Sequence, residues 1–175
     1  REENMINQLI QIVDENDDPI RGATKHDAQT DGLWHRIVKV LLRDKEGNIL
    51  LQLRGADVLS PNCWDFSASG HVDVGEDYLQ AALRELKEEL SIADVALHEI
   101  ERIKYDKTDE AGRIFRRFAV TYTGSIDHEH PIKLDKSEVV DIKWFTAAEV
   151  EELILRFPDK VTSGLKQLVK SDIWQ

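Results

Sequence analysis

The segment GHVDVGEDYLQAALRELKEELSI, Gly70 to Ile92, constrains the fold more than any other part of the chain. Apolar residues recur at helical spacing from about Asp77 to Leu90, which predicts one amphipathic helix with a single buried stripe. The residues of this predicted stripe are Leu79, Ala82, Leu83, Leu86 and Leu90. Strand patterns lie on both sides of the helix in the sequence, and they indicate an α+β sandwich with a mixed sheet.

The flanking segments predict short strands joined by turns. IQIVDENDDPIRGATK predicts two strands around a polar turn, and LWHRIVKVLLRDKEGNILLQLRG predicts a hairpin. PNCWDFSASGHV leads into a short strand, VALHEIERIKYDKTDEAGRIFRRFAVTYTG predicts a strand–turn–strand unit, and VVDIKWF predicts a further strand. TAAEVEELILRF and VTSGLKQLVK predict two helices separated by Pro158. Since no Pro/Gly/Ser linker divides the chain, we expect one domain over residues 1–175, with an N-terminal β extension over about residues 1–32.

Three carboxylates lie beside the apolar stripe of the predicted helix. Glu85, Glu88 and Glu89 are three or four residues apart or adjacent, so their like charges face one another on one arc. Most glutamate-rich helix faces are simply solvated. The alternative is that a cation lies among the three groups, because carboxylate oxygens suit Mg²⁺, which could orient a diphosphate and activate an attacking water.

The spacing around these glutamates resembles the Nudix box, G-x5-E-x7-R-E-U-x-E-E-x-G-U, where U is a bulky apolar residue. The matching residues are Gly70, Glu76, Arg84, Glu85, Leu86, Glu88, Glu89 and Ile92, which fill eight of the nine specified positions. Ser91 occupies the ninth position, where the family has a glycine that closes the helix in a left-handed turn. We therefore expect a slightly weaker helix cap but an intact catalytic set. The resemblance covers roughly Leu33 to Val150.

The resemblance implies an α/β/α sandwich with the box as a loop–helix–loop, and divalent-metal-dependent hydrolysis of a diphosphate linked to some group X. It implies that Glu85, Glu88 and Glu89 bind Mg²⁺ or Mn²⁺, and that the backbone carbonyl of Ser69 completes the metal site. Either one of these glutamates or a loop carboxylate would act as the base on water.

The same resemblance assigns supporting roles. Arg84 would hold the carboxylates in place, and Gly70 and Glu76 would shape the loop and helix of the box. Glu138, which lies outside the box, is a candidate extra carboxylate, although acidic turn residues are usually solvent contacts.

The N-terminal extension resembles the branch of the family that contains isopentenyl diphosphate isomerase. That enzyme has a catalytic Cys directly before the box glycine and a catalytic Glu on a later strand; here those places hold Ser69 and Phe115 to Arg117. Of its metal-binding histidines, His35 and His71 are matched, whereas Ala28 replaces the third. We expect hydrolysis rather than isomerisation, with isomerase-type activity and a non-catalytic nucleotide-binding module as the alternatives.

Arginine residues outside the box are candidate substrate contacts. Arg116 and Arg117 are adjacent on a predicted strand, so only one of them can face the active site, and Arg54 ends a hairpin strand. A guanidinium at these places could bind a phosphate through two hydrogen bonds, or it could be an ordinary surface charge. Trp34 and Trp64 are expected to pack in or beside the core.

The composition limits the classes of partner. The net charge of −11 argues against a protein that binds a nucleic acid backbone, and no apolar run reaches the roughly 18 residues of a membrane helix. Cys63 is the single cysteine and REENMINQLIQ lacks the layout of a secretory signal, so a reducing, cytoplasmic setting is expected. The expected partner is a small-molecule diphosphate; the sequence is compatible with a homodimer and does not specify X.

Overall fold

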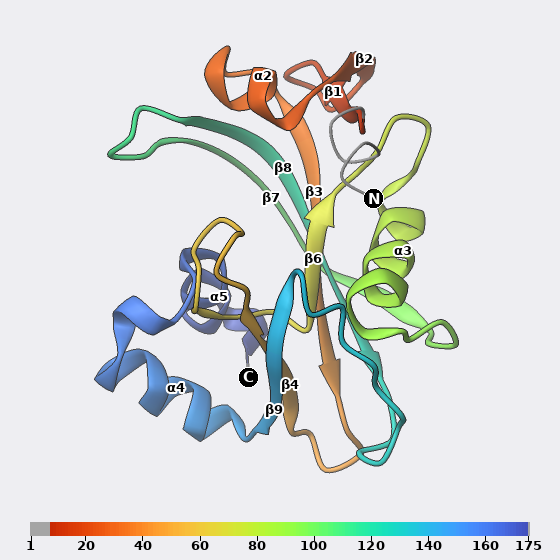
Figure 1. The fold of residues 1–175 in the computed structure, drawn as a ribbon, viewed down its shortest axis with the longest axis vertical. Helices are drawn as coiled ribbons and strands as arrows, with labels where there is room; N and C mark the ends of the chain where they lie inside the picture. The colour runs from red at the N-terminus through yellow and green to blue at the C-terminus, as the bar shows by residue number, and fades with distance from the viewer. Residues whose placement is uncertain (1–7, 175) are drawn as a thin grey trace.

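The computed structural model describes residues 8–174 and contains a mixed sheet flanked by helices (Figure 1). The strands are β1 Ile10–Val13, β2 Pro19–Ala23, β3 His35–Arg43, β4 Ile49–Arg54, β5 Trp64–Asp65, β6 Ala68–His71, β7 Leu97–Thr108, β8 Ile114–Ser125 and β9 Val139–Phe145. The helices are α2 Lys25–Thr30, α3 Tyr78–Leu90, α4 Ala147–Arg156 and α5 Ser163–Val169, with 3-10 turns at Pro158–Lys160 and Asp172–Trp174. Within these residues, no helix has the length and apolar character needed to cross a membrane.

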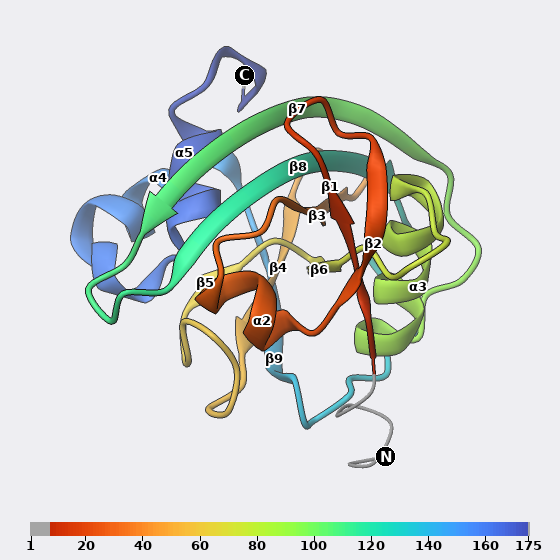
Figure 2. The same ribbon diagram turned by 90° about the horizontal axis from the view of Figure 1, so that it is seen from above.

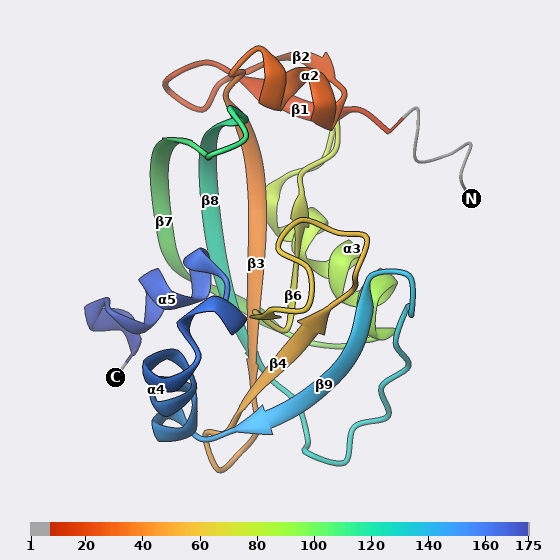
Figure 3. The same cartoon turned by 60° about the vertical axis from the view of Figure 1, so that its left-hand side comes forward.

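Strand β3 organises the sheet, because it pairs antiparallel with β1, β4 and β6 and parallel with β8. The predicted β3–β4 hairpin is present, but its strands pair only near the turn, at Leu42↔Leu50 and Arg43↔Ile49. Beyond those pairs β4 leaves β3 and pairs along its length with β9, while β6 pairs with β3 (Figure 3). The sheet therefore splits, and the box helix lies beside the split.

Helices cover both faces of the sheet, as Figures 1 and 2 show. On one face, α3 buries Leu86 and Leu90 against Val38 and Val40 of β3. On the other face, α4 and α5 pack around a second core that includes Leu41. The expected α/β/α sandwich is confirmed, and β3 is buried on both of its faces.

The N-terminal extension lies across one end of the sheet (Figure 1). Strand β1 pairs with β2 and meets β3 at Ile12↔His35. A small cluster of Ile10, Ile12, Ala23 and Ala28 is buried beneath it. Because β1 continues the same sheet, we propose that the extension belongs to the same domain as the rest of the chain. Residues 1–7 of the predicted extension lie outside the described residues.

The buried stripe of α3 differs from the prediction at its first turn. Leu79 is 40% exposed, so its assignment to the core was wrong. Tyr78 takes the core position instead, and its hydroxyl donates a hydrogen bond to Asp17 at 2.8 Å. The buried face of α3 therefore contains the side chains of Glu85 and Glu89 together with the apolar residues.

Candidate active site

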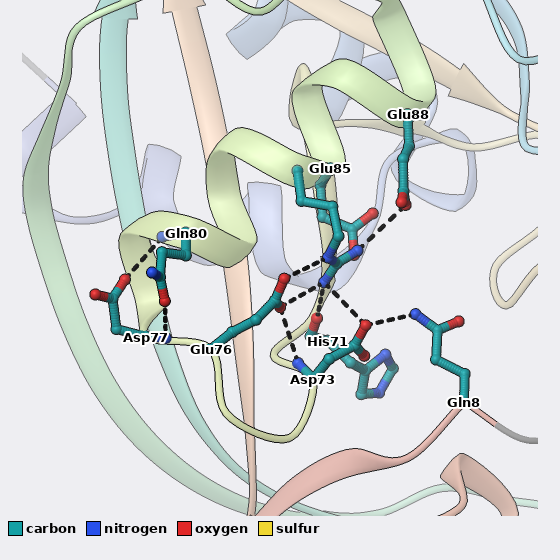
Figure 4. Close-up of polar contacts among 9 residues, drawn as sticks. Gln8, His71, Asp73, Glu76, Asp77, Gln80, Glu85 and Glu88 are labelled. Atoms are coloured by element: carbon teal, nitrogen blue, oxygen red, sulfur yellow. Dashed lines mark hydrogen bonds and ion pairs between the residues drawn. The ribbon is translucent and has the colours of Figure 1, made fainter.

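Arg84 connects the carboxylates of Glu76, Glu85 and Glu88, three residues that Figure 4 labels. Its guanidinium donates to Glu76 at 2.8 and 3.0 Å, to Glu85 at 2.8 Å and to Glu88 at 3.2 Å. It also donates to the backbone carbonyl of His71 at 2.8 Å. Burial lowers the pKa of Arg84, but its hydrogen bonds and the charge of Glu85 outweigh burial and raise it overall. Arg84 is therefore a permanent cation that holds the helix, the loop and two carboxylates together.

The loop before α3 is fixed by Glu76 and by the helix cap. Glu76 accepts a hydrogen bond from the backbone N–H of Asp73 at 3.1 Å, in addition to those from Arg84. Asp77 caps the helix, because its side chain accepts from the N–H of Gln80 while the Gln80 side chain accepts from the N–H of Asp77 (Figure 4). These contacts fix where α3 starts, and hence where its glutamates point.

Gly70 leaves space for the carboxylate of Glu85. A Cβ added at Gly70 would lie 1.9 Å from Oε1 of Glu85, a distance that no side chain tolerates. Gly70 pairs with Val38 in the sheet, so its backbone position is set by β3. The glycine of the box is thus required by close approach of the carboxylate to the strand.

Two of the three glutamates, Glu85 and Glu89, are buried. Glu85 is 8% and Glu89 is 4% exposed. Burial raises the pKa of Glu85 to about 7, although Arg84 opposes this shift. Burial and the charge of Glu85 raise the pKa of Glu89 well above its usual value, although Gln52 donates a hydrogen bond to it at 2.6 Å. By contrast, the side chain of Glu88 is 57% exposed.

The donor set fits the divalent cation that the box implies. All three side chains offer carboxylate oxygens, the ligands that Mg²⁺ and Mn²⁺ prefer. Burial raises the pKa of Glu85 and Glu89, so a divalent cation beside them would stabilise their charged forms. Within residues 8–174, no group of three or more His, Cys, Asp or Glu side chains is already arranged to hold a metal. Arg84 instead holds Glu85 and Glu88. An ion would therefore compete with Arg84 for these oxygens.

Arg54 and Ser69 lie next to the carboxylates. Arg54 donates to Asp65 at 2.8 Å and reaches the hydroxyl of Ser69 at 3.4 Å. Its positive charge opposes the rise in the pKa of Glu89, which shows that the guanidinium and this carboxylate are within electrostatic reach. The negative charge of Glu138 acts on Glu85 and Glu89 in the opposite direction.

The two adjacent arginines make different contacts. Arg116 is paired with Asp106 at 3.0 Å and its side chain is 42% exposed. Arg117 is half-buried, and its Nε donates to Nε2 of His35 at 3.0 Å. Arg117 therefore faces the buried histidines, whereas Arg116 is engaged at the rim.

The tryptophans and histidines singled out in the sequence, Trp34, Trp64, His35 and His71, are packed. Trp34 lies against the α3 core and Trp64 against the α4–α5 core, as predicted. His35 is fully buried, and burial lowers its pKa to about 4. Its ring stacks on that of His71 at 5.4 Å, and burial lowers the pKa of His71 as well. Both histidines are neutral at pH 7.

Three polar residues near the site were not anticipated from the sequence. Lys39, Gln52 and Asp65 are 6%, 2% and 6% exposed. Lys39 interrupts the apolar run IVKVLL and Gln52 interrupts ILLQL, and a polar residue inside such a run is the signal that could have identified both. Asp65 carried no comparable signal, because its neighbours are those of a loop.

Comparison with known proteins agrees with this geometry. Residues 33–165 match the NUDIX domain. The chain belongs to the Nudix family. It is 32% identical over 171 residues to isopentenyl-diphosphate Delta-isomerase 2 of Photorhabdus laumondii, covering 97% of this chain and 95% of that protein. It is also 32% identical over 138 residues to an uncharacterized Nudix hydrolase of Pseudomonas aeruginosa, covering 78% of each. These relatives place the chain in the isomerase-like branch.

Solved structures share the fold. DR0079 from Deinococcus radiodurans superposes with a TM-score of 0.76 at 21% identity, covering 93% of this chain and 98% of that one. The Nudix domain of Shewanella oneidensis NrtR, solved with ADP ribose, has a TM-score of 0.60 at 20% identity, covering 78% and 84%. The E. coli dihydroneopterin triphosphate pyrophosphohydrolase has a TM-score of 0.60 at 21% identity, covering 77% and 90%. With the family established, the chain is a Nudix hydrolase, an enzyme acting on phosphoric anhydrides.

Proposed function

We propose that this Nudix hydrolase cleaves a diphosphate linkage in a nucleoside diphosphate derivative or a related organic pyrophosphate, by attack of water and with Mg²⁺ or Mn²⁺. The observation that carries the proposal is the pair of buried carboxylates of Glu85 and Glu89, of which Glu85 lies against Gly70, in a box that departs from the family pattern only at Ser91. A bound divalent cation would balance these charges, neutralise phosphoryl oxygens and lower the pKa of the attacking water. The net charge of −11 also supports a small-molecule substrate over a nucleic acid.

The roles of the residues follow from their positions. Glu85, Glu88 and Glu89, with the carbonyl of Ser69, would hold the cation, and Arg84 sets the orientation of two of these carboxylates. A carboxylate with a raised pKa can take a proton from water near neutral pH, so Glu85 and Glu89 are candidate bases.

Groups around the carboxylates would contact the substrate. Arg54 would supply a guanidinium group for the phosphoryl oxygens of the diphosphate, because its charge acts on Glu89, and Arg117 would contact the X group. Glu138 remains an alternative base or an additional ligand, because its charge reaches the carboxylate pair.

Isomerase activity is the second candidate, because the Photorhabdus laumondii relative is named as an isomerase. Against it, Ser69 lies where the isomerase has its catalytic Cys, and Phe115 to Arg117 occupy the place of its acidic residues. The hydroxyl of Ser69 and the guanidinium of Arg117 differ in chemistry from a thiolate and a carboxylate and do not replace them. A non-catalytic nucleotide-binding module is the third candidate, and the complete set of box carboxylates disfavours it.

The test is a panel of organic diphosphates, including isopentenyl diphosphate, incubated with and without Mg²⁺ or Mn²⁺ and followed by ³¹P and ¹H NMR. We expect metal-dependent release of phosphomonoesters, reduced at least about 100-fold in Glu88→Gln and unchanged in Glu152→Gln, an exposed glutamate on α4. Formation of dimethylallyl diphosphate would establish isomerase chemistry instead. No turnover of any diphosphate, with retained nucleotide binding, would favour the binding module.

A further inference from the structure

Four strands present polar groups on the sheet face opposite α3. Strand register places Tyr105, Arg117 and His35 side by side on β7, β8 and β3. Four residues away on each of these strands, and therefore on the same face, the register aligns Glu101, Thr121, Lys39 and Ser69 on β7, β8, β3 and β6. Directly opposed residues in paired strands share one face, so these two rows form a single surface. Ser69 links this face to the carboxylate site, because its hydroxyl lies 3.4 Å from Arg54, whose charge acts on Glu89. At the other side of the face are β7 and β8, which curve together in Figure 2.

Lys39 is a buried cation on this surface without an ion pair. The residue is 6% exposed, and its ammonium lies 5.2 Å from the ring centre of Phe66. Among residues 8–174, no carboxylate forms a salt bridge with it, although Glu101 and Asp65 attract it at longer range. Asp65 is paired with Arg54 instead.

The other charges around Lys39 do not compensate it. Glu101 accepts a hydrogen bond from the hydroxyl of Thr121 at 3.3 Å, which occupies part of that carboxylate. Arg117 and Lys107 repel the ammonium and, together with burial, lower the pKa of Lys39. The surface therefore carries more positive than negative charge.

Arg117 is the second such cation. Because Nδ1 of His35 lies 2.8 Å from the carbonyl of Leu33, we assign the ring hydrogen to Nδ1, which leaves Nε2 to accept from Nε of Arg117. The guanidinium packs on Phe115 at 4.5 Å and lies 3.5 Å from the hydroxyl of Tyr105. In the part of the chain that the structure describes, Arg117 has no salt bridge. Its orientation is fixed, while N–H donors remain without an acceptor from the protein.

A third unsatisfied group lies beside these cations. Nε2 of His71 is buried and has no hydrogen-bond partner among the described residues. Its ring stacks on His35, the histidine that accepts from Arg117. An acceptor brought in by a ligand would satisfy donors that the protein alone leaves open.

Uncompensated cations at a buried surface are costly, and most chains avoid them or pair them. Here they persist in a protein of net charge −11 that has abundant carboxylates for pairing. An apolar X group on the diphosphate would leave both cations unpaired and desolvated. A negatively charged X group would pair with them at the moment of binding.

We propose that the X group of the substrate carries its own anion, a phosphate or a carboxylate, which Lys39 and Arg117 bind on the sheet face opposite α3. The diphosphate occupies the carboxylate site, and the X group extends from Ser69 along the two polar rows. This inference deepens the proposed function and rests on it for the position of the diphosphate. It names the substrate class as an organic diphosphate with a second anionic centre.

The test compares ligands that differ only in one anion. UDP-glucuronate and UDP-glucose differ by a carboxylate, and NADP⁺ and NAD⁺ differ by a phosphate. Each is titrated calorimetrically with Ca²⁺ present to balance the diphosphate charge, so that binding is measured without reliance on turnover. We expect the wild type to bind the anionic member of at least one pair about tenfold more tightly. The pair that is discriminated identifies the anion as a carboxylate or a phosphate.

Three variants test whether a preference for the anionic ligand comes from Lys39 and Arg117 or from the overall charge of the protein. Lys39→Met keeps the buried stem and removes the charge, and Arg117→Gln keeps a hydrogen-bonding side chain. Each is expected to bring the affinity ratio of the two members close to 1. Lys104→Met is the matched control, because Lys104 alternates with Tyr105 on β7 and donates to the carbonyl of Glu15 instead. It is expected to keep the full ratio.

The outcomes separate this inference from the proposed function. Equal binding of both members in both pairs, or a preference that survives in Lys39→Met and Arg117→Gln, would overturn the inference even if hydrolysis is observed. A preference lost equally in Lys104→Met would overturn it as well, since long-range charge would then be the cause. A preference that depends on Lys39 and Arg117 in a protein without hydrolase activity would uphold the anion site and refute the proposed hydrolysis.

Discussion

At the scale of single residues, the carboxyl of Glu85 combines opposing influences. It is buried, it touches the space left by Gly70, and Arg84 donates to it at 2.8 Å. Burial nevertheless dominates and raises its pKa to about 7. The carboxyl can therefore be charged or neutral near physiological pH, and its protonation state should affect both metal binding and the stability of the fold.

The raised pKa of Glu85 predicts a pH-dependent stability. In the unfolded chain the carboxyl has its ordinary value near 4.5, so between pH 4.5 and 7 the folded state holds a proton that the unfolded state has released. Its contribution to stability is fully present below pH 4.5 and is lost as pH rises through 7. In metal-free protein, Glu85→Gln should therefore raise the free energy of unfolding at pH 8 by on the order of 2 kcal/mol and leave it unchanged at pH 4.5. Urea denaturation at both pH values measures this.

Glu88→Gln is the control for this pH effect, because its side chain is 57% exposed. It should change stability little at either pH. A loss of stability in Glu85→Gln at pH 8 would show that the ion pair with Arg84 outweighs burial, contrary to the direction of the pKa shift.

The close approach of Gly70 to Glu85 predicts a selective loss of activity. In Gly70→Ala the new methyl group overlaps the carboxylate, which can swing away because it ends a flexible side chain. We expect hydrolysis to fall at least about 100-fold, while the free energy of unfolding changes by only about 1 kcal/mol. A double-mutant cycle with Glu85→Gln checks the cause, since Gly70→Ala should have no further effect on activity in that background. If the two losses of activity were additive, the loss in Gly70→Ala would not act through Glu85.

At the scale of elements, α3 is well specified at its start and strained at its end. The capping box of Asp77 and Gln80 satisfies the first N–H groups. At the C-terminus, Ser91 adopts φ 59° and ψ 29°, the left-handed conformation expected for the glycine of the box. Its hydroxyl donates to the carbonyl of Lys133 at 3.1 Å, which partly offsets the strain.

Substitution of Ser91 tests this balance. Ser91→Gly removes the steric cost of the left-handed conformation and should stabilise the protein by roughly 0.5–1 kcal/mol. Ser91→Ala keeps the strain and loses the hydrogen bond to Lys133, so it should be the least stable of the three. Chemical denaturation of the wild type and both variants measures their free energies of unfolding and so gives their order of stability. A serine protein more stable than the glycine variant would show that the hydrogen bond outweighs the strain.

At the scale of the whole molecule, the sequence predicted the elements better than their arrangement. Local alternation and turn residues predicted β1 to β4, β6 to β9 and the helices α3, α4 and α5, because these signals depend on neighbours in the chain. The short helix α2 and the two-residue strand β5 were not predicted. Local patterns do not reveal which distant strands pair with each other. They therefore could not predict that β4 and β6 separate, or that Lys39 is buried on the second face of the sheet. The misplaced Leu79 has the same origin: Tyr78 is buried through its contact with Asp17, sixty-one residues away.

The site shows the same division. Spacing alone brought together Arg84, Glu85 and Glu88, since they share one helix, and the contacts of Arg84 are those expected of it. Gln52, which reaches Glu89 from β4, could not be placed without the sheet topology. The metal-binding and catalytic roles of these residues stay predictions.

A bound cation should be visible in the stability of the whole fold. Folding brings Glu85 and Glu89 together and no equivalent cluster exists in the unfolded chain, so the proposed Mg²⁺ or Mn²⁺ should bind the folded state preferentially. At 100 times its dissociation constant the ion should add about 2.7 kcal/mol to the free energy of unfolding, seen as a rise in Tm by calorimetry. The rise should be larger at pH 8 than at pH 6, because protons compete for a carboxyl whose pKa is about 7. Glu85→Gln and Glu88→Gln should reduce it, whereas Glu152→Gln on α4 should not. If Tm is insensitive to both ions at pH 8, the carboxylates hold no cation, and the raised pKa of Glu85 serves a different purpose.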